Sequence, residues 1–217
     1  MKKLAIFDLD GTLLYTLEDL HASTNFALES EGLPARSLDE VRCFVGNGIR
    51  KLIERAVPDG CAPDVTDRVF AAFKRHYAEN CMVLTRPYPG IPEMLDALKA
   101  RGWKLGVVSN KADEPVKALI AHYFPGVFDS VVGERENVRK KPAPDSVFET
   151  VGSLGCDIGQ AVYIGDSDVD GQTAANAGCD CVLVAWGFRG RETLLPFGCP
   201  IADSTDELLN ILTEGKK

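Results

Sequence analysis

The sequence predicts an α/β fold, in which a mostly parallel sheet is covered by helices and a helical segment is inserted after the first strand. Two patterns lead to this prediction. From residue 92 onward, short apolar runs alternate with helix-like segments, which is typical of parallel strands joined by crossover helices. Between residues 16 and 77, apolar residues recur only at helical spacing. The 217 residues, 45% of them hydrophobic, are enough to form a core of this size.

The first strand is expected at residues 4–7, a short apolar run that ends at Asp8. The insertion after it is expected to hold four helical segments. The first stops at Gly32-Leu33-Pro34, and the second begins at the capping-box sequence Ser37-Leu38-Asp39-Glu40. A break at Gly46-Asn47-Gly48 precedes the other two, which are expected at residues 49–57 and 65–77.

The alternating part predicts the rest of the sheet and its domain boundaries. Strands are expected at residues 104–108, 128–132, 161–164 and 181–185, with helices at 92–101, after Asp113, from near Pro144 and at about 169–177. The α/β domain is therefore split by the insertion. We expect it to comprise residues 1–15 and 82–217, with a helical domain at 16–81 and chain crossings near 13–17 and 80–90.

Two carboxylates follow the first expected strand. Asp8 and Asp10 stand at its end, and Gly11 and Thr12 come next. The carboxyl ends of parallel strands form the ligand crevice of an open α/β sheet, and a glycine there lets the backbone turn tightly. Taken alone, the segment is explained equally well as an acidic turn, which Asp and Gly favour.

Polar residues also follow the next strands. Ser109 and Asn110 end the strand at 104–108, where a hydroxyl and backbone N–H groups can hold an anionic oxygen or cap a helix. Lys141, kept extended by Pro142, can bring a positive charge into the same crevice. The alternative is a solvated basic loop.

Three acids follow the strand at residues 161–164, namely Asp166, Asp168 and Asp170. Helix capping explains one of them, because acids are favoured at a helix N-terminus. Together with the acids of the first strand, however, the cluster would repel itself unless a cation lies between the carboxylates. Carboxylates and a backbone carbonyl are ligands that Mg²⁺ takes, so we expect a magnesium site at this edge.

These strand ends resemble the four ordered motifs of the haloacid-dehalogenase-like (HAD) phosphohydrolases, over nearly the whole chain. The resemblance implies a Rossmann-like three-layer α/β/α core with a small α-helical cap domain, as in the phosphoglycolate phosphatase-like and β-phosphoglucomutase branch. Tyr15-Thr16 departs from the Asp-Ser pair of many relatives, which bears on substrate choice and cap closure rather than on the reaction. The matching motifs are Asp8-Leu9-Asp10-Gly11-Thr12-Leu13, Ser109, Lys141-Pro142 and Gly165-Asp166-Ser167-Asp168-Val169-Asp170.

The resemblance also implies roles for the motif residues. Asp8 attacks phosphorus to form an aspartyl-phosphate, while Asp10 protonates the leaving group and then activates water. Mg²⁺ is held by Asp8, the Asp10 backbone carbonyl and Asp166. The other members support these groups: Asp170 orients the metal ligands, Lys141 neutralises charge, and Ser109, Gly11, Thr12 and Asn110 hold phosphoryl oxygens.

The expected substrate is a small phosphorylated metabolite, with 2-phosphoglycolate first, because Phe44-Val45-Gly46-Asn47-Gly48 resembles the substrate loop of phosphoglycolate phosphatases. Asn47, Arg50 and Lys51 are candidates to read a carboxylate or hydroxyl, although surface helix charges explain Arg50 and Lys51 equally well. A sugar phosphomutase and a nucleotide or sugar phosphatase share the core motifs. A haloacid dehalogenase is disfavoured because it needs no metal or second acid, and a non-enzymatic phospho-acceptor switch needs no inserted cap.

The composition of the chain indicates which binding partners and which cellular compartment to expect. The net charge of −8, without a dense Lys or Arg run, argues against a nucleic-acid or membrane-surface binder. The seven cysteines form no CxxC pair, which suits reduced structural thiols in the cytoplasm. The apolar run before Asp8 is too short for a signal peptide, and no stretch has membrane-spanning length. We expect a cytoplasmic monomer or homodimer.

Overall fold

A computed structural model describes residues 3–214 of the chain. Its contacts divide the chain into two compact units. The α/β unit runs to Leu14 and resumes at Pro87, and the helical unit is Tyr15–Arg86. The chain therefore leaves the first unit once and returns once, and the short strands β2 (Leu14–Tyr15) and β3 (Arg86–Pro87) pair with each other where it does so.

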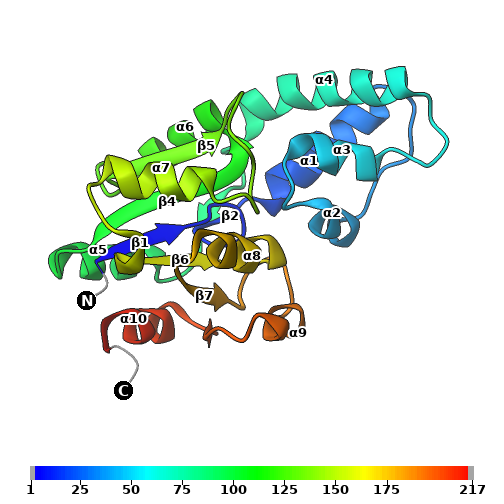
Figure 1. The fold of residues 1–217 in the computed structure, drawn as a ribbon. Coiled ribbons are helices and arrows are strands. Elements are labelled where there is room, and N and C mark those ends of the chain that lie inside the picture. The colour runs from blue at the N-terminus through cyan, green and yellow to red at the C-terminus, as the bar shows by residue number, and fades with distance from the viewer. Residues whose placement is uncertain (1–2, 215–217) are drawn as a thin grey trace. The chain divides into compact units, whose positions relative to one another are not determined.

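The α/β unit is built on a six-stranded sheet in the order β5-β4-β1-β6-β7-β8, and every neighbouring pair is parallel. Figure 1 shows β1 lying between β4 and β6. This arrangement confirms the predicted α/β class and its mostly parallel sheet. The strands are β1 (Leu4–Phe7), β4 (Lys104–Ala112), β5 (Ser130–Glu134), β6 (Ala161–Gly165), β7 (Asp180–Val184) and β8 (Ile201–Ala202).

Helices complete the layers of this unit. α7 packs beside α8, and α5 packs beside α10. The predicted helices are confirmed to within one or two residues, whereas β8, α9 and α10 lie beyond the last element that the sequence pattern predicts. The helices are α5 (Ile91–Ala100), α6 (Asp113–Tyr123), α7 (Asp145–Ser153), α8 (Asp168–Ala177), α9 (Arg191–Leu194) and α10 (Thr205–Glu214).

The central strand is buried throughout because its neighbours cover it on both edges and helices cover its faces. All four residues of β1 are fully buried, and Ile6 lies in register between Gly106 of β4 and Tyr163 of β6. A Cβ at Gly106 would come within 2.7 Å of the Thr150 side chain, so glycine lets α7 approach the sheet. Ile6 and Tyr163 belong to a core cluster that continues into α7 and α8.

Two strands differ from the prediction. β4 continues past Val108 to Ala112 through a register shift, so Ser109 and Asn110 lie inside the strand rather than after it. β5 begins two residues later than predicted, and the two residues before it contact β1 and β4. The Phe128 ring lies edge-on to the Phe7 ring, and the Asp129 carboxylate accepts a hydrogen bond from the Leu105 N–H.

The helical unit contains the four predicted helices, α1 (Leu17–Glu29), α2 (Leu38–Phe44), α3 (Ile49–Ala56) and α4 (Pro63–Asn80). α1 packs chiefly on α4. The predicted capping box is present: the Ser37 hydroxyl accepts from the Glu40 N–H, and the Glu40 carboxylate accepts from the Ser37 N–H. No helix within residues 3–214 is long and apolar enough to cross a membrane.

Candidate active site

Three buried carboxylates meet at the carboxyl edge of the sheet. Asp8 follows β1, Asp166 follows β6, and Asp170 lies in the first turn of α8. Their oxygens lie within 4.8 Å of one another, and Asp170 is fully buried. The neighbouring strands hold the edge together, since the Asp8 N–H donates to the Ile164 carbonyl at 2.8 Å. Of the acids expected to converge at this edge, the structure brings these three together, whereas Asp10 and Asp168 lie outside the group.

Lys141 lies among these acids. Its Nζ is 2.8 Å from Oδ1 of Asp8 and 2.8 Å from Oδ1 of Asp170, and its side chain is only 4% exposed. One ammonium facing three carboxylates leaves an excess of negative charge, which is costly in a buried site unless a cation balances it. The donor set is all oxygen, as hard divalent cations prefer, so these residues fit such an ion.

Burial and mutual repulsion change the protonation of the cluster. Burial raises the pKa of Asp8 from 3.8 to about 7, with Lys141 opposing the rise and Asp170 adding to it. Burial, followed by the charges of Asp170 and Asp8, raises the pKa of Asp166. Burial lowers the pKa of Lys141, but the two carboxylates outweigh it and hold the pKa well above its usual range. The ammonium therefore stays charged, and the carboxylates compete with one another for ionisation.

Asp166 is held in place by two loops. Its Oδ1 accepts from the Thr12 hydroxyl at 3.4 Å, and its Oδ2 accepts from the Phe188 N–H at 2.6 Å. Gly11 has a φ of +89°, and a Cβ there would collide with the Asp166 carboxylate, as would one at Gly187. Gly11 and Thr12 were expected to hold substrate, whereas these contacts give them a part in seating Asp166. The loop that holds Gly187 and Phe188 was not predicted.

Asp170 is fixed from both sides. Its Oδ2 accepts from the N–H and the hydroxyl of Ser167, at 3.1 and 2.6 Å, which makes a capping box at the start of α8. Its Oδ1 accepts from Lys141. A Cβ at Gly165 would collide with the Asp170 side chain, so the strand end must be glycine. Ser167 is therefore the N-cap residue, and Asp170 is the acid of the predicted cluster that completes the capping box.

Asn110 anchors the loop that carries Lys141. Its Oδ1 accepts from the Lys141 N–H at 2.9 Å, and its Nδ2 donates to the Lys141 carbonyl at 3.1 Å. Sequence reasoning expected this side chain to bind substrate, whereas both ends of its amide contact the Lys141 backbone. The buried Ser109 hydroxyl accepts from the N–H of Lys111 at 3.1 Å.

Lys111 is a residue of the site that sequence reasoning missed. Its Nζ donates to both carboxylate oxygens of Asp10, at 2.8 and 3.0 Å, and its side chain is 3% exposed. The side chain of Asp10 thus lies against a lysine of its own and outside the group of three acids. Its position in the sequence could have identified it, because Lys111 directly follows the candidate site residues Ser109-Asn110.

The candidates in the helical unit contact other residues of that unit. Arg50 pairs with Glu54 at 3.0 Å and with Asp67 at 2.6 Å, and Lys51 pairs with Glu54 at 2.7 Å. The Asn47 amide oxygen accepts from Arg55 at 2.9 Å. Surface helix pairing is therefore present, and substrate binding by Asn47 and Arg50 stays a prediction.

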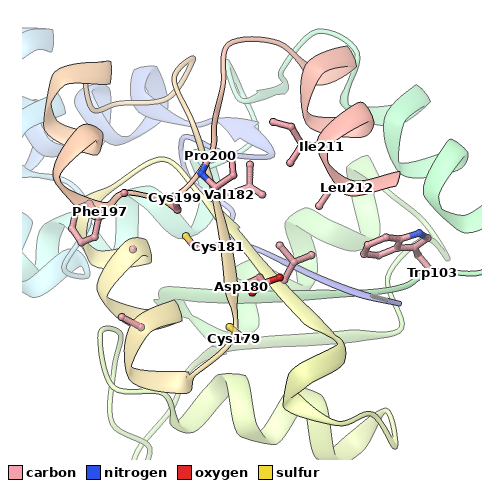
Figure 2. A pocket seen from close by; sticks show the side chains of 14 residues that line it. Trp103, Cys179, Asp180, Cys181, Val182, Phe197, Cys199, Pro200, Ile211 and Leu212 are labelled. Atoms are coloured by element: carbon pink, nitrogen blue, oxygen red, sulfur yellow. The ribbon is translucent and has the colours of Figure 1, made fainter. Parts of the chain in front are cut away.

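A separate cavity of about 380 Å³ lies against β7, α8 and α10. Figure 2 shows Cys179, Cys181 and Cys199 around it, together with the apolar side chains of Trp103 and Leu212. Among residues 3–214, no lysine or arginine lines this cavity, so the described lining offers no positive charge to a phosphate group. All seven cysteines of the chain are free thiols.

The parallel sheet and the buried acid cluster define a class of α/β enzyme whose site can hold a cation and an anionic ligand at the strand ends. Residues 5–184 match the family model of the haloacid dehalogenase-like hydrolases, and the chain belongs to this family. Its relatives make it a phosphatase of that family.

The relatives share most of the chain. A phosphoglycolate phosphatase of Aquifex aeolicus is 35% identical over 89% of this chain and 90% of that protein. One of Caulobacter vibrioides is 38% identical over 87% and 82%. The crystal structure of a protein from Lactobacillus delbrueckii subsp. bulgaricus has a TM-score of 0.93 and 36% identity, covering 98% of this chain and 99% of that one.

Proposed function

We propose that this protein hydrolyses a small phosphomonoester, with 2-phosphoglycolate as its preferred substrate, by a magnesium-dependent route through an aspartyl-phosphate. The observation that carries the proposal is the buried cluster of Asp8, Asp166 and Asp170 around Lys141. Such a cluster would supply a nucleophile, a cation site and a fixed positive charge at one sheet edge, as phosphoryl transfer requires.

Asp8 is the nucleophile, because a carboxylate attacks phosphorus without needing a base to activate it. Lys141, 2.8 Å from Asp8 Oδ1, orients this carboxylate and neutralises charge on the incoming phosphoryl group. Asp10 gives a proton to the leaving oxygen and then takes one from the water that cleaves the aspartyl-phosphate. Ser109 and the backbone N–H groups near Gly11 orient phosphoryl oxygens.

Asp8, Asp166 and the Asp10 carbonyl would hold the magnesium ion, which would supply positive charge to neutralise the phosphate. Asp170 has a positioning part instead, since its Oδ1 accepts from Lys141 and its Oδ2 accepts from Ser167 at the start of α8. It fixes Lys141 beside the nucleophile, and Asn110 fixes the backbone of the same lysine.

The substrate is inferred from the relatives, several of which are named phosphoglycolate phosphatases at 31–38% identity. We further propose that the helical unit serves as a cap domain and that Asn47 and Arg50 contact the substrate from it. Localisation in the cytoplasm and action as a monomer or homodimer complete the proposal.

A phosphomonoester panel with Mg²⁺ tests the function, using wild type, Asp8→Asn and Asp168→Asn. Asp168 is a matched control, because it belongs to the same acidic segment but its side chain is 46% exposed. Phosphate release from 2-phosphoglycolate should fall by about six orders of magnitude in Asp8→Asn, as for the loss of other nucleophiles, and stay near wild type in Asp168→Asn. Turnover that survives Asp8→Asn would contradict the mechanism. Isomerisation of glucose 1-phosphate with catalytic bisphosphate would indicate a mutase instead.

A further inference from the structure

We propose that Lys111 is the specificity-determining residue that binds a carboxylate on the leaving group, on the carbon next to the phosphate ester. The inference rests on the proposed function, because it places this carboxylate in 2-phosphoglycolate. It assigns recognition of this carboxylate to a residue of the sheet, in addition to the contacts proposed for the helical unit.

The position of Lys111 is unusual for a lysine. It lies in β4 at the register shift between Val108 and Ala112, and its side chain is 3% exposed. Lysine is almost never this buried unless it is paired, since removing an ammonium from water is costly. Its partner is Asp10, and both carboxylate oxygens accept from Nζ.

The two buried lysines of the site contact different acids. Lys141 contacts Asp8 and Asp170, which belong to the cluster that would meet the phosphoryl group and the cation. Lys111 contacts Asp10, the acid that must face the leaving oxygen. The charge of Lys111 is therefore placed on the leaving-group side of the reaction.

The chemistry of the leaving group completes the argument. A general acid lies within hydrogen-bond reach of the oxygen that it protonates, so the ester oxygen would lie next to Asp10. In 2-phosphoglycolate the carboxylate is bonded to the same carbon as that oxygen. The ammonium that contacts Asp10 would therefore lie beside the substrate carboxylate, where the opposite charges attract. A charge-assisted hydrogen bond in a dry site discriminates strongly against a neutral analogue.

The test compares 2-phosphoglycolate with 2-hydroxyethyl phosphate, in which a neutral CH₂OH replaces the carboxylate. The measured quantity is the ratio of kcat/KM for the acid to that for the alcohol, in wild type, Lys111→Met and Lys111→Arg. We expect Lys111→Met to lower this ratio by at least about 10-fold, the usual effect of one hydrogen bond to a charged group, and Lys111→Arg to restore part of it. Lys117→Met is the control, because Lys117 is a 57% exposed lysine of α6 paired with Asp113.

Binding gives a second readout that does not depend on turnover. In an Asp8→Asn background, calorimetry should show that Lys111→Met weakens the Kd of 2-phosphoglycolate by a similar factor and leaves that of 2-hydroxyethyl phosphate within about twofold. Thermal melting of each variant verifies that it is folded, and Lys111→Gln replaces Lys111→Met if the latter does not fold.

The outcomes separate this inference from the proposed function. An equal fall of both substrates in Lys111→Met, with an unchanged ratio, would mean that Lys111 only positions Asp10 and would overturn the inference. A wild type that hydrolyses both substrates equally well would also overturn it, while leaving the phosphatase mechanism intact. Absence of any Asp8-dependent phosphate release would instead overturn the proposed function.

Discussion

The ion pairs at the sheet edge of the α/β unit differ from the ion pairs on the surface of the helical unit in how deeply they are buried. At the carboxyl edge of the sheet, Lys141 and Lys111 are almost fully buried, and their partners are acids with at most 15% of the side chain exposed. In the helical unit, charges pair on the surface, as Arg50 does with Asp67, where the two side chains are 41% and 63% exposed. Burying the charged groups at the sheet edge lowers the stability of the folded state, whereas pairing charges on the surface does not.

The exposed and the buried ion pairs differ in how they affect the free energy of unfolding. Exposed ion pairs contribute little because water already solvates and screens both partners. Buried acids around one lysine lower stability unless something balances their charge, so such a cluster indicates a site for chemistry rather than for folding. Changes at the sheet edge should therefore have large effects that depend on pH and cations, whereas loss of an exposed ion pair in the helical unit should change stability little.

The largest expected effect is a pH dependence of stability in the metal-free protein. The folded pKa of Asp8 is raised from 3.8 to about 7, so between these values the folded state holds a proton that the unfolded state has lost. Asp8 therefore makes the protein less stable as pH rises through this window, by roughly 4 kcal/mol in total at about 1.4 kcal/mol per pKa unit. The measurement is urea unfolding in chelator at pH 5 and pH 8.

Asp8→Asn is the matched variant, since asparagine keeps the shape and cannot ionise. It should be more stable than wild type at pH 8 without metal and should lose most of this advantage at pH 5. Mg²⁺ should stabilise wild type more at pH 8 than at pH 5, because metal binding needs ionised carboxylates. Equal pH slopes for wild type and Asp8→Asn would contradict the burial argument.

The contrast between the units also shows what could be predicted from the sequence. Strand alternation places Asp8, Lys141 and Asp166 at one edge, because parallel strands end together, and the fold and this cluster were predicted on that ground. Lys111 was missed because β4 was expected to end at Val108, and the register shift that continues the strand leaves no periodic signal.

Other contacts of the site join residues that are far apart in the sequence, so they could not be predicted from it. Phe188 reaches Asp166 from 22 positions away, in a loop whose composition predicts no contact, and both ends of the Asn110 amide bond the Lys141 backbone across 31 positions. Residue type and spacing locate which strand ends carry chemistry. They do not reveal which side chain at an end contacts substrate and which one holds a neighbour in place.

Two glycines with similar backbone angles, one in each unit, allow a second comparison of the two units. We expect substitutions at these glycines to have effects of intermediate size. Gly11 in the α/β unit has φ +89°, and Gly60 in the helical unit has φ +85°. A Cβ at Gly11 would collide with the Asp166 carboxylate, whereas one at Gly60 meets nothing within 4 Å. Gly60→Ala should therefore cost only the strain of the left-handed conformation, about 1 kcal/mol, in thermal unfolding.

Gly11→Ala carries the same strain and also displaces Asp166. It should weaken magnesium affinity, measured by calorimetry, by about 10-fold or more, as expected when an oriented ligand is disturbed. Gly60→Ala is the control and should bind magnesium as wild type does. Equal magnesium affinities for the two variants would show that the close approach of Gly11 to Asp166 has no part in forming the cation site.

The smallest structural effect is expected from Arg50→Ala. Arg50 is exposed and its partners, Glu54 and Asp67, are solvated, so thermal stability should stay close to that of wild type. If Arg50 contacts substrate as proposed, KM for 2-phosphoglycolate should rise several-fold, with kcat changed little, because a lost contact that is equal in the ground and transition states appears only in KM. Arg68→Ala is the control, as Arg68 also pairs with two acids of this unit, Glu31 and Asp64. An unchanged KM in Arg50→Ala would mean that Arg50 only forms surface ion pairs and does not contact the substrate. Substrate selection would then depend on the sheet edge, where the charges are buried.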